Sequence, residues 1–465
     1  MKVVARAASH RRQALTVPFL VLFLASQALL WLAYYSGDAK TLIGDEQTYQ
    51  ASALAILGGG PWMPSSIWPP LQPLFIAAVY AVFGTHLLAV QIAQSLLFVA
   101  CAALLRVLWR HLGSSVAAAN TAAALWLLNP SSAAYAHWLW PELPQVFLLL
   151  AALCLLARIG SALGTFLSGL CIGLAILAKS LLSMFWPLFL IALLRRKRPY
   201  LLLRPAVAFV LGLALVTAPA LLHGWREYGR PMIADSSIYN VWVGLNDTWR
   251  SDYVADMGGV TLPEFIASGA TPQQRNAVYM DKVRALVNEQ GLLHVISDQL
   301  GRQYFRLFSA KTSLVSQLPG AACAGHLSVY RSPEWLTRVL TALNDLMHAL
   351  LLAGCAFGIA TRRWRSPTAN AQRRRLLAVI VLLFGYQLAL FLLIHVKARF
   401  LLPMVPFLCG FAGSFLVALH ARFHRGRDEP TIVLTPPRLA FGVALAALLL
   451  FLAFAGPALD HLCAT

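Results

Sequence analysis

The sequence predicts an all-α protein that crosses a membrane about eleven times. The 465 residues are 59% hydrophobic and only 12% charged, which is too apolar for an ordinary soluble domain. Apolar runs of roughly 15 to 22 residues recur from Val17 to Phe454, and about 20 helical residues cross a hydrocarbon core. Alternation with a period of two is missing, so helices rather than a membrane barrel are expected.

The charge distribution predicts the orientation of these spans. The chain carries 37 Lys and Arg against 18 Asp and Glu, for a formal charge of +19. In a soluble protein this excess would suggest a nucleic-acid partner. Here topology explains it, and no nucleic acid is expected, because more than half of the basic residues fall in clusters that the positive-inside rule places in the cytoplasm. These clusters are Lys2 to Arg12, Arg106 and Arg110, Arg158, Arg195 to Arg204, Arg362 to Arg375, and Arg422 to Arg438.

The spans then follow in order along the chain, in what we expect to be a bacterial inner membrane, with a cytoplasmic N-terminus and a periplasmic C-terminus. Leu71 to Gly84 is about 14 residues long, too short to cross, and is expected to lie along the interface. The expected crossings are 17–35, 87–108, 116–128, 138–157, 163–178, 181–194, 201–222, 343–360, 376–394, 400–419 and 439–454.

Three regions follow from this topology. Residues 1–222 form an N-terminal transmembrane module whose first external loop, 36–85, is expected to carry the chemistry. Residues 223–335 contain no spanning candidate and form an external loop domain, and 336–465 form a C-terminal transmembrane module. Within the external domain, Thr271 to Gly291 opens with Thr-Pro and stops at Gly, which predicts one amphipathic helix.

The seven cysteines show no pairing by spacing. Five of them lie inside apolar runs, where they are expected to be small buried hydrophobes: Cys101, Cys154, Cys171, Cys355 and Cys409. Cys323 and Cys463 would lie on the oxidising side, and their location leaves a disulfide between them open.

Acidic residues gather at the external face. Asp45 and Glu46 follow the first span by about ten residues, and Glu142 opens a later span after Pro141. A carboxylate at this depth could serve as a general base or as a metal ligand. The alternative is structural, with Asp45 capping a helix that starts at Glu46 and Glu142 matching the dipole of its own helix.

Basic residues at the same face run against the charge rule. Lys179, Lys397 and Arg399 flank apolar runs, and His395 lies beside them. An anionic ligand would account for these cations, because a phosphate gains charge-assisted hydrogen bonds from Lys and a bidentate fork from Arg. The alternatives are snorkelling to the interface and an ion pair with Glu142.

Aromatic residues also crowd this face. Interfacial belts explain most of them, and stacking on a sugar ring would explain a few, Trp68 among them. No Walker motif, Rossmann fingerprint, HExxH or CxxC occurs, so nucleotide use, zinc-protease chemistry and thiol redox have no support. The energy for any reaction must therefore come with the substrate.

The ordered set of these segments resembles the GT-C membrane glycosyltransferases, which include the protein O-mannosyltransferases and the lipid A aminoarabinose transferases. The resemblance covers most of the chain. It is carried by GDEQTYQASALAILGGG, WPPLQPLFIAAVYAVFG, LNPSSAAYAHWLWPELPQVFLLLAALCLL, LSGLCIGLAILAKSLL, YNVWVGLND and HVKARFLLPMVPFL.

The resemblance implies roles for individual residues. Asp45 falls on the catalytic base, with Glu46 beside it, and Glu142 matches a second acid that would serve the acceptor or a metal. Lys179 and Arg399 match donor phosphate-binding positions, to which His395 and Lys397 are added. Lys397 departs from the pattern, because an acid often precedes that Arg. Possible substrate-lining residues are Tyr239, Asn240, Asn246 and Trp68.

The implied activity is transfer of a sugar from a polyprenyl-phosphate donor to a lipid, glycan or protein acceptor, with inversion. The implied partners are that donor, membrane lipids and the acceptor, and the implied cofactor is at most a divalent ion such as Mg²⁺, Mn²⁺ or Zn²⁺ held by Asp45 and Glu142. Two alternatives stay open. A lipid-linked oligosaccharide ligase or polymerase shares the face and the donor type, and a permease or flippase for an anionic solute would need polar residues near mid-bilayer.

Overall fold

The described part of the chain is entirely helical in its regular elements. The computed structural model describes residues 24–25, 27–28, 42, 44–157, 162–193, 200–245, 257–309, 333–364, 371–424 and 431–454. Within these ranges no β-strand occurs, and one isolated bridge joins Arg362 to Ile432. The expectation of an all-α protein is therefore confirmed. Most of the first expected span, together with Asn246, Cys323 and Cys463, lies outside the described residues.

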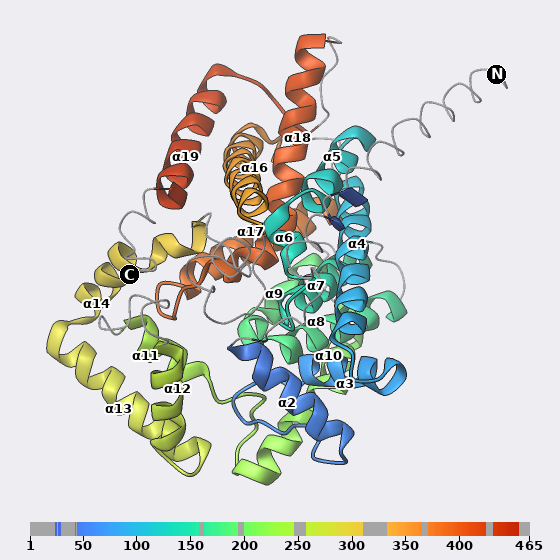
Figure 1. The fold of residues 1–465 in the computed structure, drawn as a ribbon. Coiled ribbons are helices and arrows are strands. Elements are labelled where there is room, and N and C mark those ends of the chain that lie inside the picture. Colours follow the sequence, from blue (N-terminus) through green and yellow to red (C-terminus); the bar gives the residue numbers. More distant parts are fainter. Residues whose placement is uncertain are drawn as a thin grey trace.

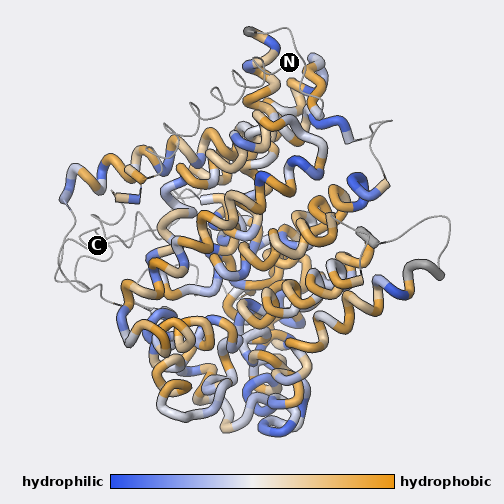
Figure 2. Tube along the Cα trace, turned by 90° about the vertical axis from the view of Figure 1, so that its right-hand side faces the viewer, coloured by the Kyte–Doolittle hydropathy of each residue, from blue (hydrophilic) through white to orange (hydrophobic). Residues whose placement is uncertain are grey.

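The long helices carry the membrane character of the chain. Five described stretches are long and apolar enough to cross a membrane, judged by length and composition. They are α4 (Leu87–His111), Leu203–Tyr228 within α10 (Tyr200–Tyr228), α16 (Glu334–Thr361), Ala398–Phe423 over η5 (Ala398–Met404) and α18 (Val405–His424), and α19 (Pro436–Phe454). Figure 2 shows hydrophobic residues along most of the length of the helices. The chain is thus a multi-pass membrane protein, and the number of eleven crossings stays a prediction.

Shorter helices complete the bundle. Four of them are apolar: α3 (Leu71–Phe83), α5 (Val116–Leu127), α7 (Glu142–Ala157) and α8 (Ala162–Ala178). The others are α2 (Asp45–Leu57) and the single-turn α6 (Pro130–Ala134), and α17 (Ala371–Leu390) is a longer helix of 20 residues. Figure 1 shows α5, α16 and α18 toward one end of the molecule and α2 and α3 at the other, with α4 running between the two ends. The four expected cysteines on α4, α7, α16 and α18 are buried, and Cys171 on α8 is half-buried.

One expected span is not a continuous helix. Residues 180–193 form η1 (Ser180–Leu182), α9 (Trp186–Phe189) and η2 (Leu190–Leu193). Pro187 lies in the first turn of α9, where it lacks the N–H that a helix continuing from η1 would need. The hydroxyl of Tyr386 donates to the freed Leu181 carbonyl at 2.6 Å. The prediction of one helix over 181–194 is therefore wrong for the described part of this segment.

The region expected to be external, residues 223–335, contains a set of short helices in its described part. They are α11 (Ser237–Leu245), α12 (Met257–Ala267), α13 (Pro272–Gln290), α14 (Leu292–Arg302) and η4 (Tyr304–Phe308). Figure 1 shows α11, α12 and α13 side by side, toward the same end of the molecule as α2. The expected amphipathic helix is α13, and Thr271 and Gln274 form a capping box at its start, which satisfies two otherwise orphan N–H groups.

A buried ion pair ties α13 and the segment before α11 to the segment between α2 and α3. The carboxylate of Asp235 is buried and accepts from Nε of Arg275 at 3.0 Å. The Nη2 atom of Arg275 also donates to the hydroxyl of Ser66 at 3.0 Å, and the N–H of Asp235 donates to the Ser66 carbonyl at 2.7 Å. This network fixes the segment between α2 and α3, because a buried charge without its partner is costly.

Glycines let the apolar helices α8 and α10 approach each other closely. A Cβ atom added at Gly169 on α8 would clash with the backbone carbonyl of Phe209 on α10. A Cβ atom at Gly212 on α10 would in turn clash with the carbonyl of Phe166 on α8. Small residues at such crossings allow backbone-to-backbone packing, which drives helix association in lipid. This crossing fixes the end of α8, where Lys179 follows.

Candidate functional site

Four ionisable side chains from distant parts of the chain meet in one cluster. Asp45 opens α2, Glu142 opens α7, Lys179 directly follows α8 and Arg399 lies in η5. The Nη2 atom of Arg399 is 2.6 Å from Oδ2 of Asp45, and its Nε atom is 3.6 Å from Oε1 of Glu142. The Nζ atom of Lys179 donates to the same Glu142 oxygen at 2.9 Å. We call these four residues the ion cluster.

The members of the ion cluster differ in their access to solvent. The Glu142 side chain is 2% exposed, whereas Arg399, Lys179 and Asp45 are 16%, 17% and 23% exposed. Glu142 is therefore the buried anchor between the two cations. Its Oε2 atom and the Nε atom of Arg399 are buried and make no hydrogen bond within the described part of the chain, so the cluster retains unused bonding capacity.

Aromatic rings hold both cations. The guanidinium carbon of Arg399 lies 4.6 Å from the centroid of the Trp140 ring, and Nζ of Lys179 lies 4.0 Å from that of Phe400. Trp138 stacks on Trp140 with the centroids 4.6 Å apart. Cations over aromatic faces gain electrostatic attraction. Each cation is thus held by one ring as well as by a carboxylate.

The protonation of the cluster follows from burial and charge. Burial raises the pKa of the Asp45 carboxyl, but Arg399, Lys397 and Lys179 together outweigh it, so the pKa lies below its ordinary value. Burial lowers the pKa of Lys179 and Arg399 lowers it further, while Glu142 opposes both, so that it falls to about 8. Asp45 is therefore ionised at neutral pH, and Lys179 is charged but close to losing its proton.

Tyr49 lies beside the cluster, on the same face of α2 as Asp45 and one turn further along. It is buried, and its ring centroid lies 5.9 Å from that of Trp68. Burial, with the neighbouring carboxylates of Asp45 and Glu142, raises the pKa of Tyr49 well above its ordinary value. Tyr49 is thus a neutral phenol, and its ring contact links Trp68, one of the four expected substrate-lining residues, to this cluster.

Buried polar side chains of α4 and α2 hold the loop before α7 in place. The Nε2 atom of Gln94 on α4 donates to the carbonyl of Trp138 at 2.7 Å. The carboxylate of Glu46 is fully buried and accepts from the backbone N–H of Leu139 at 3.0 Å. These hydrogen bonds satisfy the backbone carbonyl of Trp138 and the backbone N–H of Leu139, which lipid could not do. They also fix the positions of Glu142 and of the stacked tryptophans. The bond of Glu46 positions this loop, and the catalytic role expected for Glu46 beside Asp45 stays a prediction.

Among the structural roles that the sequence left open for the cluster residues are helix capping by Asp45 and an ion pair with Glu142, and of these two the structure shows only the second. Gly44, with φ of +54°, is the N-cap of α2, and no side chain caps it. Asp45 is therefore not the capping residue that the structural alternative required. The expected alternative of an ion pair with Glu142 is realised for Lys179.

The remaining basic candidates lie at the edge of the cluster. Lys397 is the N-cap of η5, and its charge contributes to the lowered pKa of Asp45. His395 is buried, and its backbone N–H donates to the carbonyl of Asn240 at 2.8 Å. The structure thus brings Lys397 within electrostatic range of Asp45 and ties the His395 backbone to α11.

Two expected substrate-lining residues make contacts within the external helices. The hydroxyl of Tyr239 lies 2.7 Å from Oγ1 of Thr261, and the Tyr239 ring packs on Phe265 at 5.3 Å between centroids. The side-chain amide of Asn240 donates to the Ser236 carbonyl at 2.7 Å. Asn246 lies outside the described residues. The lining role of these residues stays a prediction.

The cluster does not fit a resident metal ion. Among the described residues, no three His, Cys, Asp or Glu side chains gather so that they could hold a metal. Only two carboxylates are present, and Arg399 contacts both while Lys179 contacts one. Cations at these positions compete with a divalent ion for the same oxygens, so no step is derived through a metal.

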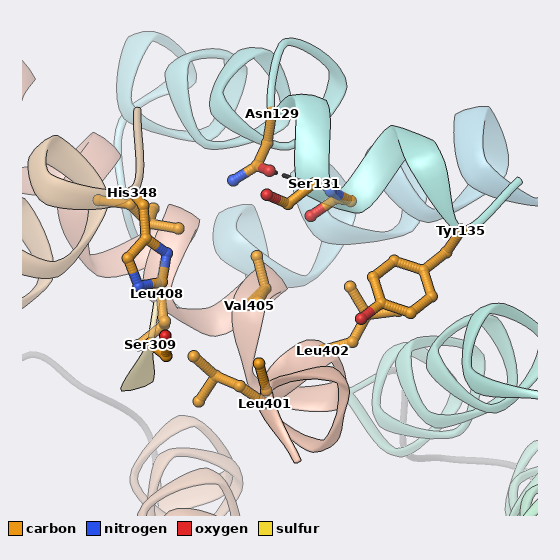
Figure 3. Close-up of a pocket in the computed structure, with 12 residues that line it drawn as sticks. Asn129, Ser131, Tyr135, Ser309, His348, Leu401, Leu402, Val405 and Leu408 are labelled. Atoms are coloured by element: carbon orange, nitrogen blue, oxygen red, sulfur yellow. Dashed lines mark hydrogen bonds between the residues drawn. The ribbon is translucent and has the colours of Figure 1, made fainter. Parts of the chain in front are cut away.

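A pocket adjoins the cluster on η5. It encloses about 400 Å³ including its mouth, and Ala398, the neighbour of Arg399, lines it. Figure 3 shows Asn129, Ser131 and Tyr135 along one wall and leucines along another. The Tyr135 ring lies 6.1 Å from that of Trp140. The four cluster residues do not line this pocket, and they reach solvent through their own exposed atoms.

Sequence reasoning missed several residues that hold the cluster together. Gln91 and Gln94 interrupt an otherwise apolar run, and buried polar groups in such a run must find partners. That signal was available. Trp140 and Phe400 each lie one or two residues from an ionisable group, but the same spacing is ordinary for interfacial aromatics, so no sequence signal singles them out.

Comparisons with known proteins give only weak likenesses. No family model matches the chain, and no curated protein matches it. The fold is similar to the Archaeoglobus fulgidus oligosaccharyltransferase in the apo form, at 14% identity and a TM-score of 0.49, over 94% of this chain and 56% of that one. It is also similar to ArnT from Cupriavidus metallidurans in the apo state, at 14% identity and a TM-score of 0.38, over 94% of this chain and 78% of that one.

The same ArnT bound to undecaprenyl phosphate shows 15% identity and a TM-score of 0.35, over 95% of this chain and 89% of that one. This chain therefore spans 56% of the length of the oligosaccharyltransferase. At these identities, with every TM-score below 0.5, the likenesses agree in kind with the expected GT-C fold and add no evidence about activity, substrate or partner.

Proposed function

We propose that this protein is a membrane glycosyltransferase that takes a sugar from a polyprenyl-phosphate donor at the periplasmic face. The acceptor is a hydroxyl or amine of a lipid, a glycan or a protein, and the transfer inverts the anomeric carbon. The observation that carries the proposal is the ion cluster. In it the Asp45 carboxylate lies within hydrogen-bond distance of Arg399, and the two cations, Lys179 and Arg399, lie at the ends of apolar helices.

The two cations suit the phosphate of a lipid-linked donor. Lys179 follows the apolar α8, and Arg399 begins the apolar stretch Ala398–Phe423. A lipid tail among such helices would bring its phosphate to their polar ends. Arg offers a planar fork to phosphate oxygens and Lys offers a compact charge, and both bind more strongly where water is partly excluded.

Asp45 supplies the base of the proposed reaction. The acceptor O–H or N–H would lie against its carboxylate and give up its proton there as the acceptor atom attacks the anomeric carbon. The bond from that carbon to the phosphate oxygen breaks, and its electron pair stays on the phosphate. Lys179 and Arg399 stabilise the charge that develops on the departing lipid phosphate.

The other residues of the site act by positioning. Glu142 is buried and fixes both cations, and Glu46 fixes the loop that carries Trp140. In this proposal Glu46 is not a catalytic group, and Glu142 stays a candidate for contact with the acceptor. Lys397 adds positive potential beside Asp45, and this potential attracts an anionic donor.

Two other functions remain distinct in their predictions. A lipid-linked oligosaccharide ligase or polymerase would rely on external Arg and His residues and would not need Asp45. A permease or flippase for an anionic solute would move its solute across liposome membranes without forming a covalent product. The cluster favours the transferase because it adds a carboxylate base to the anion-binding groups.

The test is the substitution Asp45→Asn, which keeps the size of the side chain and removes its basicity. Cells with and without the protein are compared by mass spectrometry of their envelope lipids and glycans. The wild-type protein is expected to add the mass of one sugar residue to an acceptor. The variant is expected to reduce that transfer by about 100-fold or more, the usual contribution of a general base.

The matched control is Asp281→Asn on α13, where the carboxylate is exposed and pairs with Arg284 at 3.2 Å. This control is expected to transfer as the wild type does. Full transfer by Asp45→Asn would favour the ligase hypothesis, and solute flux into liposomes with no new covalent product would favour the permease hypothesis.

A further inference from the structure

The ion cluster pairs two acids with two bases, and Lys397 lies within electrostatic range of Asp45. Asp45 and Glu142 bring two negative charges, and Lys179 and Arg399 bring two positive charges. A phosphate that enters this cluster brings at least one further negative charge. A partly buried anion is costly without a cation beside it, so the phosphate competes with the carboxylates for Lys179 and Arg399.

The two carboxylates are not equally able to move. Glu142 is 2% exposed and contacts both cations, so releasing it would leave a buried charge unpaired. Asp45 is 23% exposed and contacts only Arg399 within the ion cluster. It also opens the first turn of α2, directly after Gly44, where an added Cβ atom would meet nothing within 4 Å. Asp45 is therefore the carboxylate that can turn toward solvent.

We propose that Arg399 exchanges Asp45 for the donor phosphate, so that the ion pair between Asp45 and Arg399 keeps the base inactive until the donor is bound. This inference rests on the proposed function and adds its regulation. No covalent bond changes in the exchange. The Nη2 atom of Arg399 leaves Oδ2 of Asp45 and donates to a phosphate oxygen instead.

The exchange changes the basicity of Asp45. While Arg399 lies 2.6 Å away, it stabilises the ionised carboxylate and makes it a poor proton acceptor. Once phosphate takes the guanidinium, the carboxylate loses that partner and gains a negative neighbour, and both changes raise its pKa. The acceptor is thus deprotonated only beside a bound donor.

The surroundings of Arg399 allow the exchange without moving the guanidinium. Its carbon lies 4.6 Å from the centroid of the Trp140 ring, and its Nε atom faces Glu142 at 3.6 Å. These two contacts remain when Asp45 leaves. The planar fork therefore stays in place, and only the partner of Nη2 changes.

The experiment measures binding of a short-chain polyprenyl monophosphate, without sugar or acceptor, to purified protein in nanodiscs. Asp45→Asn removes the charge that competes for Arg399, and it is expected to bind this phosphate about fivefold to tenfold more tightly than the wild type, a usual size for coupling between two ligands of one group. Asp281→Asn, at an exposed position, is expected to bind as the wild type does.

A double-mutant cycle assigns the effect to Arg399. In an Arg399→Met background, Asp45→Asn is expected to give much less tightening, because the cation that the two anions share is gone. Equal or weaker phosphate binding by Asp45→Asn would overturn the exchange, as would an undiminished gain in the Arg399→Met background or no binding by any variant. The transfer assay is read separately: loss of transfer by Asp45→Asn with unchanged binding rejects the exchange and leaves the proposed function standing.

Discussion

The pKa of Lys179 gives a quantitative prediction for donor binding. Burial and Arg399 lower this pKa to about 8 against the opposing charge of Glu142. The ammonium form, which phosphate needs, is lost as the pH rises through this value. About nine tenths of Lys179 is charged at pH 7 and about one tenth at pH 9. The affinity of the ligand-free protein for a polyprenyl monophosphate should therefore fall about tenfold between these pH values if only the charged form binds well.

The assay is phosphate binding in nanodiscs from pH 6.5 to pH 10, without acceptor, so that no titration of an acceptor contributes. Lys179→Arg should bind across this range without the alkaline loss, because a guanidinium keeps its charge and the Phe400 ring can stack on it. Glu142→Gln removes the charge that raises the Lys179 pKa, so its alkaline loss should begin at lower pH.

Lys282→Arg on α13 is the matched control, because Lys282 is exposed and lies over the ring of Tyr279 at 4.4 Å. It should show the wild-type profile. A wild-type affinity that stays constant to pH 10, or the same alkaline loss in Lys179→Arg, would refute the assignment of this titration to Lys179.

Two further predictions concern the scaffold, and thermal unfolding in detergent checks both. Gly169→Ala should destabilise the protein by about 1 to 3 kcal/mol, because its Cβ would press on the Phe209 carbonyl, whereas Gly385→Ala on α17 meets nothing within 4 Å. Similar losses in both variants would show that the α8–α10 crossing is not tight. Glu46→Ala should cost about 1 to 3 kcal/mol by leaving the Leu139 N–H without its acceptor. Glu46→Gln should keep most of that stability through its amide oxygen, and an equal loss in Gln and Ala would contradict the positioning role.

The sequence predicted the membrane character and the external helix α13 correctly. Long apolar runs and a Thr-Pro start are local signals, and a chain in lipid must satisfy its backbone within each segment. The same logic failed over 181–194, where Pro187 and the Tyr386 hydroxyl favour short helical pieces. The hydrogen-bond donor to the Leu181 carbonyl is the Tyr386 hydroxyl, which lies 205 residues further along the chain. No local sequence pattern could identify a partner at that distance.

The sequence predicted which residues form the candidate site, but it did not predict how they are arranged. Charge at an unexpected face singled out Asp45, Glu142, Lys179 and Arg399, because ionisable groups beside lipid are costly. The sequence placed Asp45 and Glu46 side by side as catalytic candidates, although Glu46 is fully buried under the loop and Asp45 is partly exposed to solvent. Neighbours along a helix point about 100° apart, and only packing decides which of them faces the cluster.

By itself, the sequence determined that this chain is a membrane protein and that its ionisable side chains near lipid gather at one face. Both conclusions follow from the free energy of transferring residues between water and lipid. Only the tertiary structure decided that two acids and two bases share one cluster, that Glu142 is its buried anchor, and that Asp45 is held by Arg399. The physical reason is that ion pairing depends on distances of a few ångströms between segments hundreds of residues apart, and no local pattern encodes those distances.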